Sequence, residues 1–350
     1  TIFIGILFAN FLLFFGLLFP SVLAHYQADI EQNLLCNYQY ILQIPLNAVN
    51  ENKKLESALN MMLFQNEVET ETEGAEKFSI RSLNTTYEGS RVEAITLYGV
   101  EPDSRYISLS SAEGTVAASQ AYADKYDLTP GDTITLKEAY EDTTYTFTIT
   151  DIYPYDGALA LFMPREDLNR VFDEDKNSFS GYLSNEEITD IDTEYISSII
   201  DLEALTKISR QLTLSMGGMM NLVNGFAIII FLVIVYLLSK IIIEKNGQAI
   251  SMTKILGYSN REISRLYIFS TTFMVLLSIL ISLPLEVASM KFLFKYMMTE
   301  MMTGWISFYL DPMILVEMVS MGLGSYAIVA FLEYRRIRRI PMDEALKNVE

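Results

Sequence analysis

Apolar residues gather in four long runs, at residues 1–24, 220–243, 266–288 and 312–333. Between the first two runs, polar and apolar residues alternate over much shorter stretches. About 20 helical residues, rising ~1.5 Å each, cross the ~30 Å hydrocarbon core of a bilayer. The pattern therefore predicts four transmembrane helices, one before and three after a large insertion that begins at residue 25. The length of the first run favours a retained helix over a cleaved signal peptide.

The insertion mixes short elements of both kinds. Alternation and turn residues such as Pro130-Gly131 predict strands at residues 38–44, 77–83, 92–100, 115–118, 133–137, 145–152 and 158–163. Helical spacing predicts helices at residues 51–64, 119–126 and 165–172. Residues 25–198 are therefore expected to form a compact α+β domain. Apolar spacing over residues 199–219 predicts a stalk helix that continues into the second span, paired with an extension of the first span.

Basic residues assign the orientation. Lysines and arginines cluster at residues 244–265 and 334–350, and cytoplasmic loops carry such an excess. The domain at residues 25–198 is then extracytoplasmic. Residues 289–311 should lie along the outer interface, with Trp305 at the headgroups. The predicted fold is an α-helical, multi-pass protein of the plasma membrane, with four transmembrane helices plus a large α+β extracytoplasmic domain inserted between helices 1 and 2.

The net charge of −19 is unevenly distributed. Residues 25–213 hold 13 Lys and Arg against 34 Asp and Glu, a net of −21, and the remainder holds 12 against 10, a net of +2. Such an acidic surface repels nucleic acid, so that class of partner is excluded. The same charge would steer cationic peptides towards the exterior domain, although an acidic exterior is also an ordinary solvated surface. The single cysteine, Cys36, excludes an internal disulfide.

The residue inventory argues against an enzyme. The sequence contains no Gly-x-x-x-x-Gly-Lys-[Ser/Thr] motif, so ATP must be bound by a partner. His25 and Cys36 are the only residues of their types; they are interpreted as an interfacial histidine and a packed cysteine, and they cannot supply an ordinary zinc site. No catalytic, cofactor or metal residue is assigned. Calcium binding by the acidic runs at residues 67–76 or 173–175 stays open as an alternative.

Four polar residues interrupt the apolar runs: Glu286, Glu317, Asn221 and Asn224. An ionised carboxylate in lipid is costly, so each glutamate requires an explanation. Both fall near the outer leaflet, where they are expected to reach the headgroups or to pair with Lys291 or Lys295. A role in a substrate path or a helix-contact switch is the alternative. The two asparagines are expected to mark helix contacts.

The segment after the second span carries a recognisable pattern. An amphipathic helix at residues 248–256 is broken by Gly257, and Ser259 and Glu262 have capping-box spacing before the third span. The sequence ISMTKILGYS at residues 250–259 resembles the cytoplasmic coupling segment of FtsX-like permeases of ABC systems, the group that includes MacB. Residues 335–346 resemble the C-terminal signature of this family, and residues 131–136 resemble the exterior core of MacB-type permeases. Ala249 departs from the acidic residue that is usual there.

This resemblance implies a bacterial permease subunit, or one half of a larger permease. ATP hydrolysis by a cytoplasmic ABC ATPase dimer would move the exterior domain, with ATP and Mg²⁺ bound by that dimer. The other partners would be membrane lipid and a second permease module, either a second copy or an N-terminal half. The implied coupling residues are Ile250, Lys254, Ile255, Leu256, Gly257, Tyr258, Ser259 and Arg261. Efflux or extraction of a peptide, lipid or lipoprotein is expected; the alternative is a signalling module that senses a peptide antibiotic or controls a cell-wall hydrolase.

Overall fold

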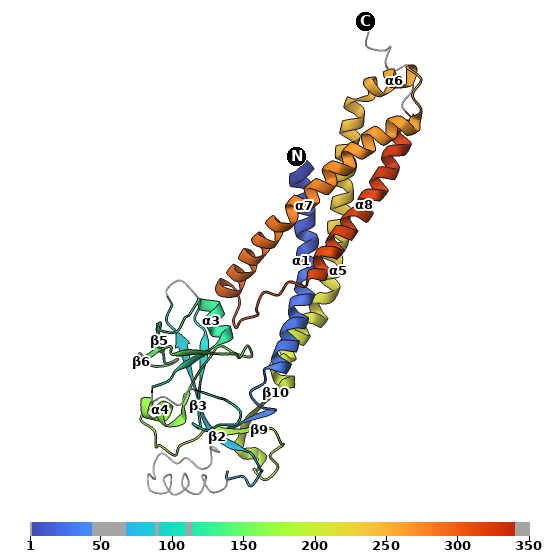
Figure 1. Ribbon diagram of the computed structural model, residues 1–350. Coiled ribbons are helices and arrows are strands. Elements are labelled where there is room, and N and C mark those ends of the chain that lie inside the picture. Colours follow the sequence, from blue (N-terminus) through green and yellow to red (C-terminus); the bar gives the residue numbers. More distant parts are fainter. Residues whose placement is uncertain (1, 44–67, 88–90, 110–113, 340–350) are drawn as a thin grey trace. The chain divides into compact units, whose positions relative to one another are not determined.

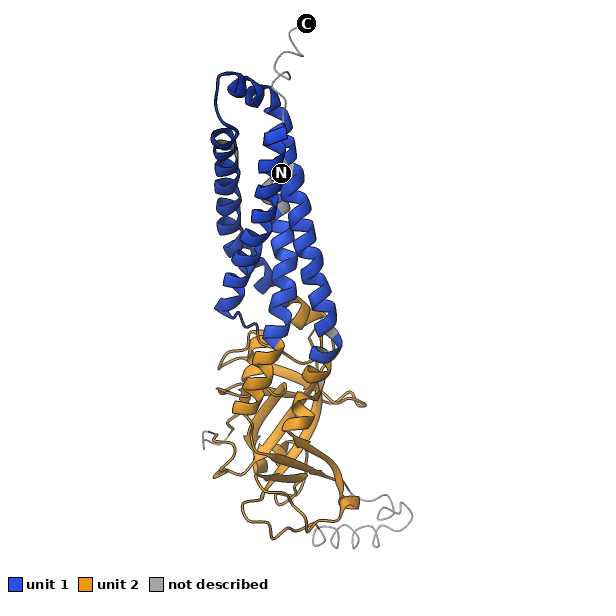
Figure 2. Ribbon diagram, turned by 90° about the vertical axis from the view of Figure 1, so that its right-hand side faces the viewer, with its two compact units in different colours: residues 1–22, 212–294, 308–350 blue, residues 23–211, 295–307 orange. Residues whose placement is uncertain are grey.

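The computed structural model describes residues 2–43, 68–87, 91–109 and 114–339. The chain divides into two compact units (Figure 2). Unit 1 comprises residues 1–22, 212–294 and 308–350, and unit 2 comprises residues 23–211 and 295–307. The predicted helix at residues 51–64 lies outside the described residues, whereas the acidic run is described from residue 68 onwards.

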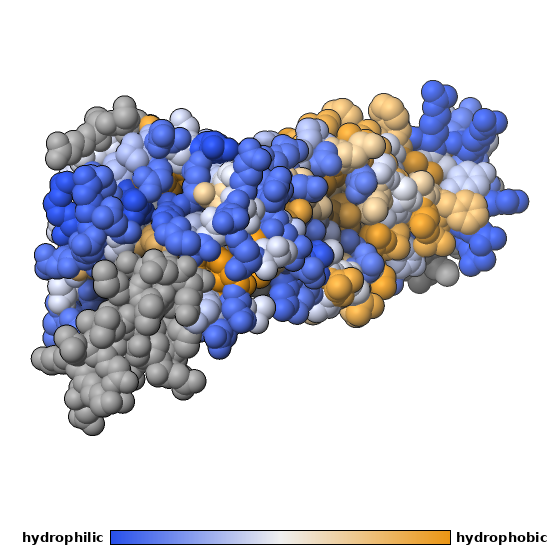
Figure 3. Space-filling model, turned by 90° about the horizontal axis from the view of Figure 1, so that it is seen from below, coloured by the Kyte–Doolittle hydropathy of each residue, from blue (hydrophilic) through white to orange (hydrophobic). Residues whose placement is uncertain are grey.

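Unit 1 is built from helices (Figure 1): α1 (Ile2–Gln32), α5 (Leu202–Lys245), α6 (Gly247–Ile255), α7 (Asn260–Glu300) and α8 (Pro312–Arg339). The end of α1, the start of α5 and the end of α7 belong to unit 2. All but α6 are long and apolar enough to cross a membrane, which confirms the four candidate spans. Their shared core takes two residues from each long helix: Ile6, Ala9, Phe231, Val235, Val275, Ile279, Tyr326 and Val329. Other large apolar side chains, such as Phe269 and Phe292, point outwards and are exposed, and Figure 3 shows hydrophobic residues gathered on part of the molecular surface. This pattern suits a bundle whose outer surface faces lipid.

Unit 2 holds one mixed sheet, which confirms the α+β prediction. Its strands are β1 (Tyr38–Leu42), β2 (Glu76–Thr85), β3 (Ala94–Val100), β4 (Ala117–Ser119), β5 (Thr133–Lys137), β6 (Thr144–Thr148), β7 (Asp151–Tyr153), β8 (Ala160–Pro164), β9 (Gly181–Ser184) and β10 (Ile196–Asp201). They follow the order β10-β1-β9-β2-β3-β8-β4-β7, and β5 pairs with both β2 and β6. The pairs β3–β8 and β4–β7 are parallel, and the remaining pairs are antiparallel.

Two short helices pack on this sheet, α3 (Gln120–Tyr126) and α4 (Arg165–Val171). The hydroxyl of Ser119 accepts a hydrogen bond from the Tyr122 amide at 3.2 Å and so caps α3. Tyr122 and Leu168 bring the two helices into one core with strand residues such as Ile95. The short 3₁₀ helix η2 (Thr193–Tyr195) precedes the last strand.

The predicted stalk helix begins later than expected. Residues 196–201 form β10, and α5 starts at Leu202 and continues without interruption to Lys245. β10 pairs with β1 from Tyr38–Asp201 onwards, so a strand that is distant in sequence supplies the hydrogen bonds that hold Ile199 extended. The predicted strand at residues 145–152 is likewise two strands, β6 and β7.

The segment after α7 belongs to unit 2. α7 continues to Glu300, and Trp305 packs against the core that contains Tyr122 and Leu168. The ring of Trp305 therefore covers a protein core, a contact that the sequence did not predict.

A buried lysine anchors this segment. The Lys125 ammonium lies 2.6 Å from the Glu93 carboxylate, and the two side chains are 0% and 2% exposed. The same ammonium donates to the carbonyls of Met302 and Gly304, both at 2.9 Å. Arg91 donates to the Met301 carbonyl at 3.2 Å. All three donors of Lys125 are thereby used, and the chain from Met301 to Gly304 is fixed to α3.

Candidate functional site

The corner between α6 and α7 ends in a glycine for a geometric reason. The Gly257 amide donates to the Lys254 carbonyl at 3.0 Å, and the Tyr258 amide donates to the Thr253 carbonyl at 3.3 Å. This pair of bonds is a Schellman motif, which requires a left-handed residue after the helix. Gly257 has a φ of 95°, a value that L side chains rarely adopt. The glycine break predicted from the sequence is therefore the residue that turns the chain.

A capping box starts the next helix, as its spacing predicts. The Glu262 carboxylate accepts from the Ser259 amide at 2.9 Å and from the Ser259 hydroxyl at 2.8 Å. The Glu262 amide donates to the Ser259 hydroxyl at 3.3 Å. Ser259 therefore has a local structural role at the start of α7, whatever else it contacts.

One face of α6 is buried against the ends of the spans. Ile250 is 0% exposed and packs with Ile243, Ile263 and Ile337. The Lys254 ammonium is buried and donates to the Ile337 carbonyl at 2.9 Å. These two predicted coupling residues therefore lie inside unit 1, where they join α6 to α5, α7 and α8, and they do not form part of its surface.

The opposite side of the corner presents an apolar surface. Ile255, Leu256 and Tyr258 are 53%, 74% and 57% exposed, and Met252 is 54% exposed. Arg261 is also exposed. We call this surface, formed by Met252, Ile255, Leu256, Tyr258 and Arg261, the corner surface. Its large apolar residues all fall between positions 252 and 258 and lie at the end of α6 and on the turn that follows, a combination typical of a protein contact site.

The polar residues of the spans separate into buried and exposed ones. Glu286 is 1% exposed, so its carboxylate lies inside the bundle. The expectation that Glu286 reaches the headgroups is therefore wrong, and no described ion pair joins it to Lys291 or Lys295. One helical turn away, Ser282 accepts a hydrogen bond from Asn10 of α1 at 3.4 Å. Polar groups of α1 and α7 thus meet inside the bundle.

Glu317 and Asn221 are exposed, as a position on the bundle surface requires. Asn224 faces α1, where its side chain lies against Gly16, and its carbonyl oxygen is buried. A side chain on Gly16 would collide with Asn224, so the small residue permits this approach of α1 and α5. The prediction of a helix contact thus fits Asn224.

His25 and Cys36 contact different residues. His25 lies 3.4 Å from the Asp29 carboxylate one helical turn away. Cys36 is buried, its thiol donates to the Tyr38 carbonyl at 3.1 Å, and burial raises its pKa to about 12. A thiol with so high a pKa is a poor nucleophile. Across the described residues, no group of three His, Cys, Asp or Glu side chains could hold a metal ion.

Asp156 of unit 2 is a titrating group that sequence reasoning missed. Burial, and to a smaller extent the charges of Asp29 and Asp124, raises its pKa to about 6 against the lowering effect of His25. A folded-state pKa above the ordinary ~3.9 means that folding favours the protonated form, so stability is highest below pH ~4 and falls as pH rises through about 6. Asp156→Asn should remove this fall. In thermal unfolding of the full chain between pH 4.5 and 8, we expect the variant to gain about 1 kcal/mol over the wild type at pH 7.5. A parallel pH profile for both proteins would contradict this assignment.

A comparison with known protein families finds a match within the helical part of the chain. Residues 221–342 match the model of the FtsX-like permease C-terminal domain. The match runs from α5 through α6, α7 and α8, and it includes every residue of the corner surface. A comparison with curated proteins finds no significant match.

Proposed function

We propose that this chain, whose residues 221–342 match the FtsX-like permease C-terminal domain, is the permease subunit, or one permease half, of an ABC system. In this proposal the candidate spans cross the plasma membrane of a bacterium, and unit 2 is extracytoplasmic. A cytoplasmic ABC ATPase dimer binds and hydrolyses ATP with Mg²⁺. A second permease module, either a second copy or an N-terminal half, completes the assembly.

The observation that carries the proposal is the exposed corner surface. Four large apolar side chains, Met252, Ile255, Leu256 and Tyr258, are each more than half exposed at a corner where five hydrogen bonds described above fix Gly257 and Ser259. A groove on the ATPase that received them would bury this apolar area. Arg261 at the edge would orient the contact.

The buried side of α6 supplies the link to the bundle. Ile250 packs with residues of α5, α7 and α8, and Lys254 holds the last turn of α8 through the Ile337 carbonyl. A displacement of the corner would therefore be passed to three spans at once. α7 then continues to Glu300, whose neighbours in sequence are fixed to α3 by Lys125. This continuous path supports a mechanism in which ATP binding moves the exterior domain.

Leu256→Asp tests the docking assignment. A charge in the centre of an apolar contact is expected to weaken binding of the cognate ATPase at least 100-fold, or about 2.7 kcal/mol, as measured with the purified full chain. Leu214→Asp is the matched control, because Leu214 is 84% exposed on α5 outside the corner. Equal affinity for wild type and Leu256→Asp would overturn the proposal. Unchanged thermal unfolding of both variants would show that the loss is local.

Efflux or extraction of a peptide, lipid or lipoprotein is the activity we favour. Residues 25–213 carry a net charge of −21, which would attract a cationic peptide to unit 2. Transport requires that such a substrate stimulate ATP hydrolysis by the complex. The signalling alternative instead requires a stable complex between unit 2 and a kinase or cell-wall hydrolase, with no stimulation by substrate.

A further inference from the structure

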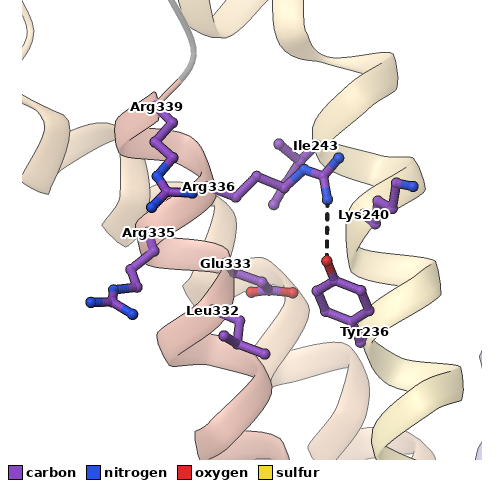
Figure 4. Close-up of a pocket in the computed structure, with 8 residues that line it drawn as sticks. All are labelled: Tyr236, Lys240, Ile243, Leu332, Glu333, Arg335, Arg336 and Arg339. Atoms are coloured by element: carbon purple, nitrogen blue, oxygen red, sulfur yellow. Dashed lines mark hydrogen bonds between the residues drawn. The ribbon is translucent and has the colours of Figure 1, made fainter.

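A cavity of about 370 Å³ lies in unit 1 between α5 and α8, at the ends of the helices that carry the basic clusters (Figure 4). Its lining residues are Tyr236, Lys240, Ile243, Leu332, Glu333, Arg335, Arg336 and Arg339. The lining thus includes four cations and one carboxylate, and Tyr236, Ile243 and Leu332 add apolar walls. We call this cavity the α5–α8 pocket.

Two of the four cations are already paired. Arg336 lies 2.5 Å from the Glu244 carboxylate and 3.5 Å from the Tyr236 hydroxyl, and Lys240 lies 4.0 Å from the same carboxylate. Figure 4 shows Arg336 extending from α8 to Tyr236 on α5. Arg335 contacts the Phe331 ring, with 5.2 Å between its guanidinium carbon and the ring centroid. Among the described residues, neither Arg335 nor Arg339 has a carboxylate partner. The pocket therefore keeps two guanidinium groups for an external anion.

The carboxylate of the pocket, Glu333, has one oxygen that lacks a hydrogen-bond donor among the described residues. Glu333 is 4% exposed, and its Oε1 atom has no hydrogen-bond partner within the described chain. In Figure 4 its side chain points from α8 into the space in front of Tyr236. A buried carboxylate oxygen without a donor costs free energy, so a ligand that brings a hydroxyl to this position gains a strong hydrogen bond.

We propose that the α5–α8 pocket binds the headgroup of an anionic, hydroxyl-bearing phospholipid such as phosphatidylglycerol. The phosphate is held by the unneutralised guanidinium groups of Arg335 and Arg339, a geometry for which arginine is well suited. A headgroup hydroxyl donates to Glu333, and the first acyl carbons lie against Leu332 and Ile243. The pocket opens at the helix ends that the charge pattern places on the cytoplasmic side, where basic pockets between spans meet anionic lipid.

Location separates a lipid from a free phosphate compound. The pocket walls belong to two candidate spans, α5 and α8, and outward-facing apolar side chains such as Leu237 and Phe331 adjoin it in sequence. A membrane lipid is already present at this depth, whereas a soluble anion gains nothing from the apolar walls. The proposal depends on the spans crossing a bilayer, and it does not depend on docking of an ATPase.

Native mass spectrometry of the full chain, titrated with dioleoyl lipids in detergent, tests the pocket. The wild type is expected to bind phosphatidylglycerol at least tenfold more tightly than phosphatidylcholine. The double variant Arg335→Gln/Arg339→Gln should reduce this ratio to about twofold or less. The control Arg265→Gln/Arg338→Gln removes the same charge from exposed residues outside the pocket, and it should keep the ratio within about twofold of wild type.

Each further outcome bears on one part of the proposal. Equal losses in the two double variants would overturn the pocket in favour of general electrostatic attraction, and so would full retention in Arg335→Gln/Arg339→Gln. Equal competition by glycerol phosphate would overturn the lipid assignment. Glu333→Gln should lower the preference for phosphatidylglycerol over phosphatidic acid several-fold, and no change would overturn the hydroxyl contact. If Arg335→Gln/Arg339→Gln unfolds, Arg335→Lys/Arg339→Lys replaces it, because this variant keeps the charge and loses the guanidinium fork. It should still weaken the preference for phosphatidylglycerol over phosphatidylcholine at least threefold.

Discussion

Lys125→Met is expected to lower the free energy of unfolding of unit 2 by about 3–5 kcal/mol, because it leaves the buried Glu93 carboxylate without its counter-ion. The substitution also removes the donor that the Met302 and Gly304 carbonyls share. A typical domain is stable by only 5–15 kcal/mol, so the loss would place unit 2 near its unfolding threshold. Thermal unfolding of the full chain measures this loss, and limited proteolysis near Met301 should report release of the segment.

Lys295→Met is the matched control for the buried pair. Lys295 lies 2.5 Å from the Asp127 carboxylate, but the two side chains are 45% and 76% exposed. Exposed ion pairs contribute about 0–1 kcal/mol, so this variant should unfold close to the wild type. If both methionine variants lost the same small amount, the burial argument would fail. The double variant Lys125→Met/Glu93→Leu should recover only part of the loss, since the two carbonyls stay without their donor.

Gly181→Ala is the second substitution with a large expected effect. A Cβ atom at this position of β9 would overlap the Tyr40 carbonyl oxygen of β1 and lie 2.8 Å from a ring carbon of Phe78 in β2. Backbone atoms cannot move aside as the end of a flexible side chain can, so one strand pairing has to separate. We expect a loss of about 3 kcal/mol in the unfolding free energy of unit 2.

A glycine with open space around it provides the comparison. Gly217 of α5 has no neighbour within 4 Å of an added Cβ atom. Gly217→Ala should be neutral or stabilising by up to about 1 kcal/mol, since alanine favours helix over glycine. A Gly181→Ala protein as stable as the wild type would mean that β1 and β9 are not paired as the structure has them.

The elements that sequence predicted well are those with a local cause. Apolar length alone defines the spans, and Ser119, Gly257 and Ser259 set helix ends through hydrogen bonds to near neighbours. β9 and β10 were not predicted, because their extended form depends on β1, which lies far away in the chain. In the sequence alone, both Ile199 and Leu202 fit the apolar spacing of a helix. Tertiary pairing decides between strand and helix there.

The candidate site shows the same limit. The sequence selects α6 and its corner, but it does not reveal which apolar residues face the bundle. Ile250 and Ile255 look alike in sequence, yet one is fully buried and the other is half exposed. Lys125 and Arg335 also look like ordinary charged residues in the sequence. Only the packing shows that Lys125 is a buried anchor and that Arg335 lines a pocket.

The pairing of β1 with β10 has a mechanical consequence. β1 follows α1 after a short connection, β10 leads directly into α5, and the two strands meet first at Tyr38 and Asp201, the residues nearest the helices. The two helices are therefore attached to the same end of one antiparallel ladder. Pulling α1 and α5 apart would break the residue pairs of this ladder one after another, starting at Tyr38 and Asp201. Moving the two helices together would leave all of these pairs intact. The sheet therefore permits α1 and α5 to move together and resists their separation.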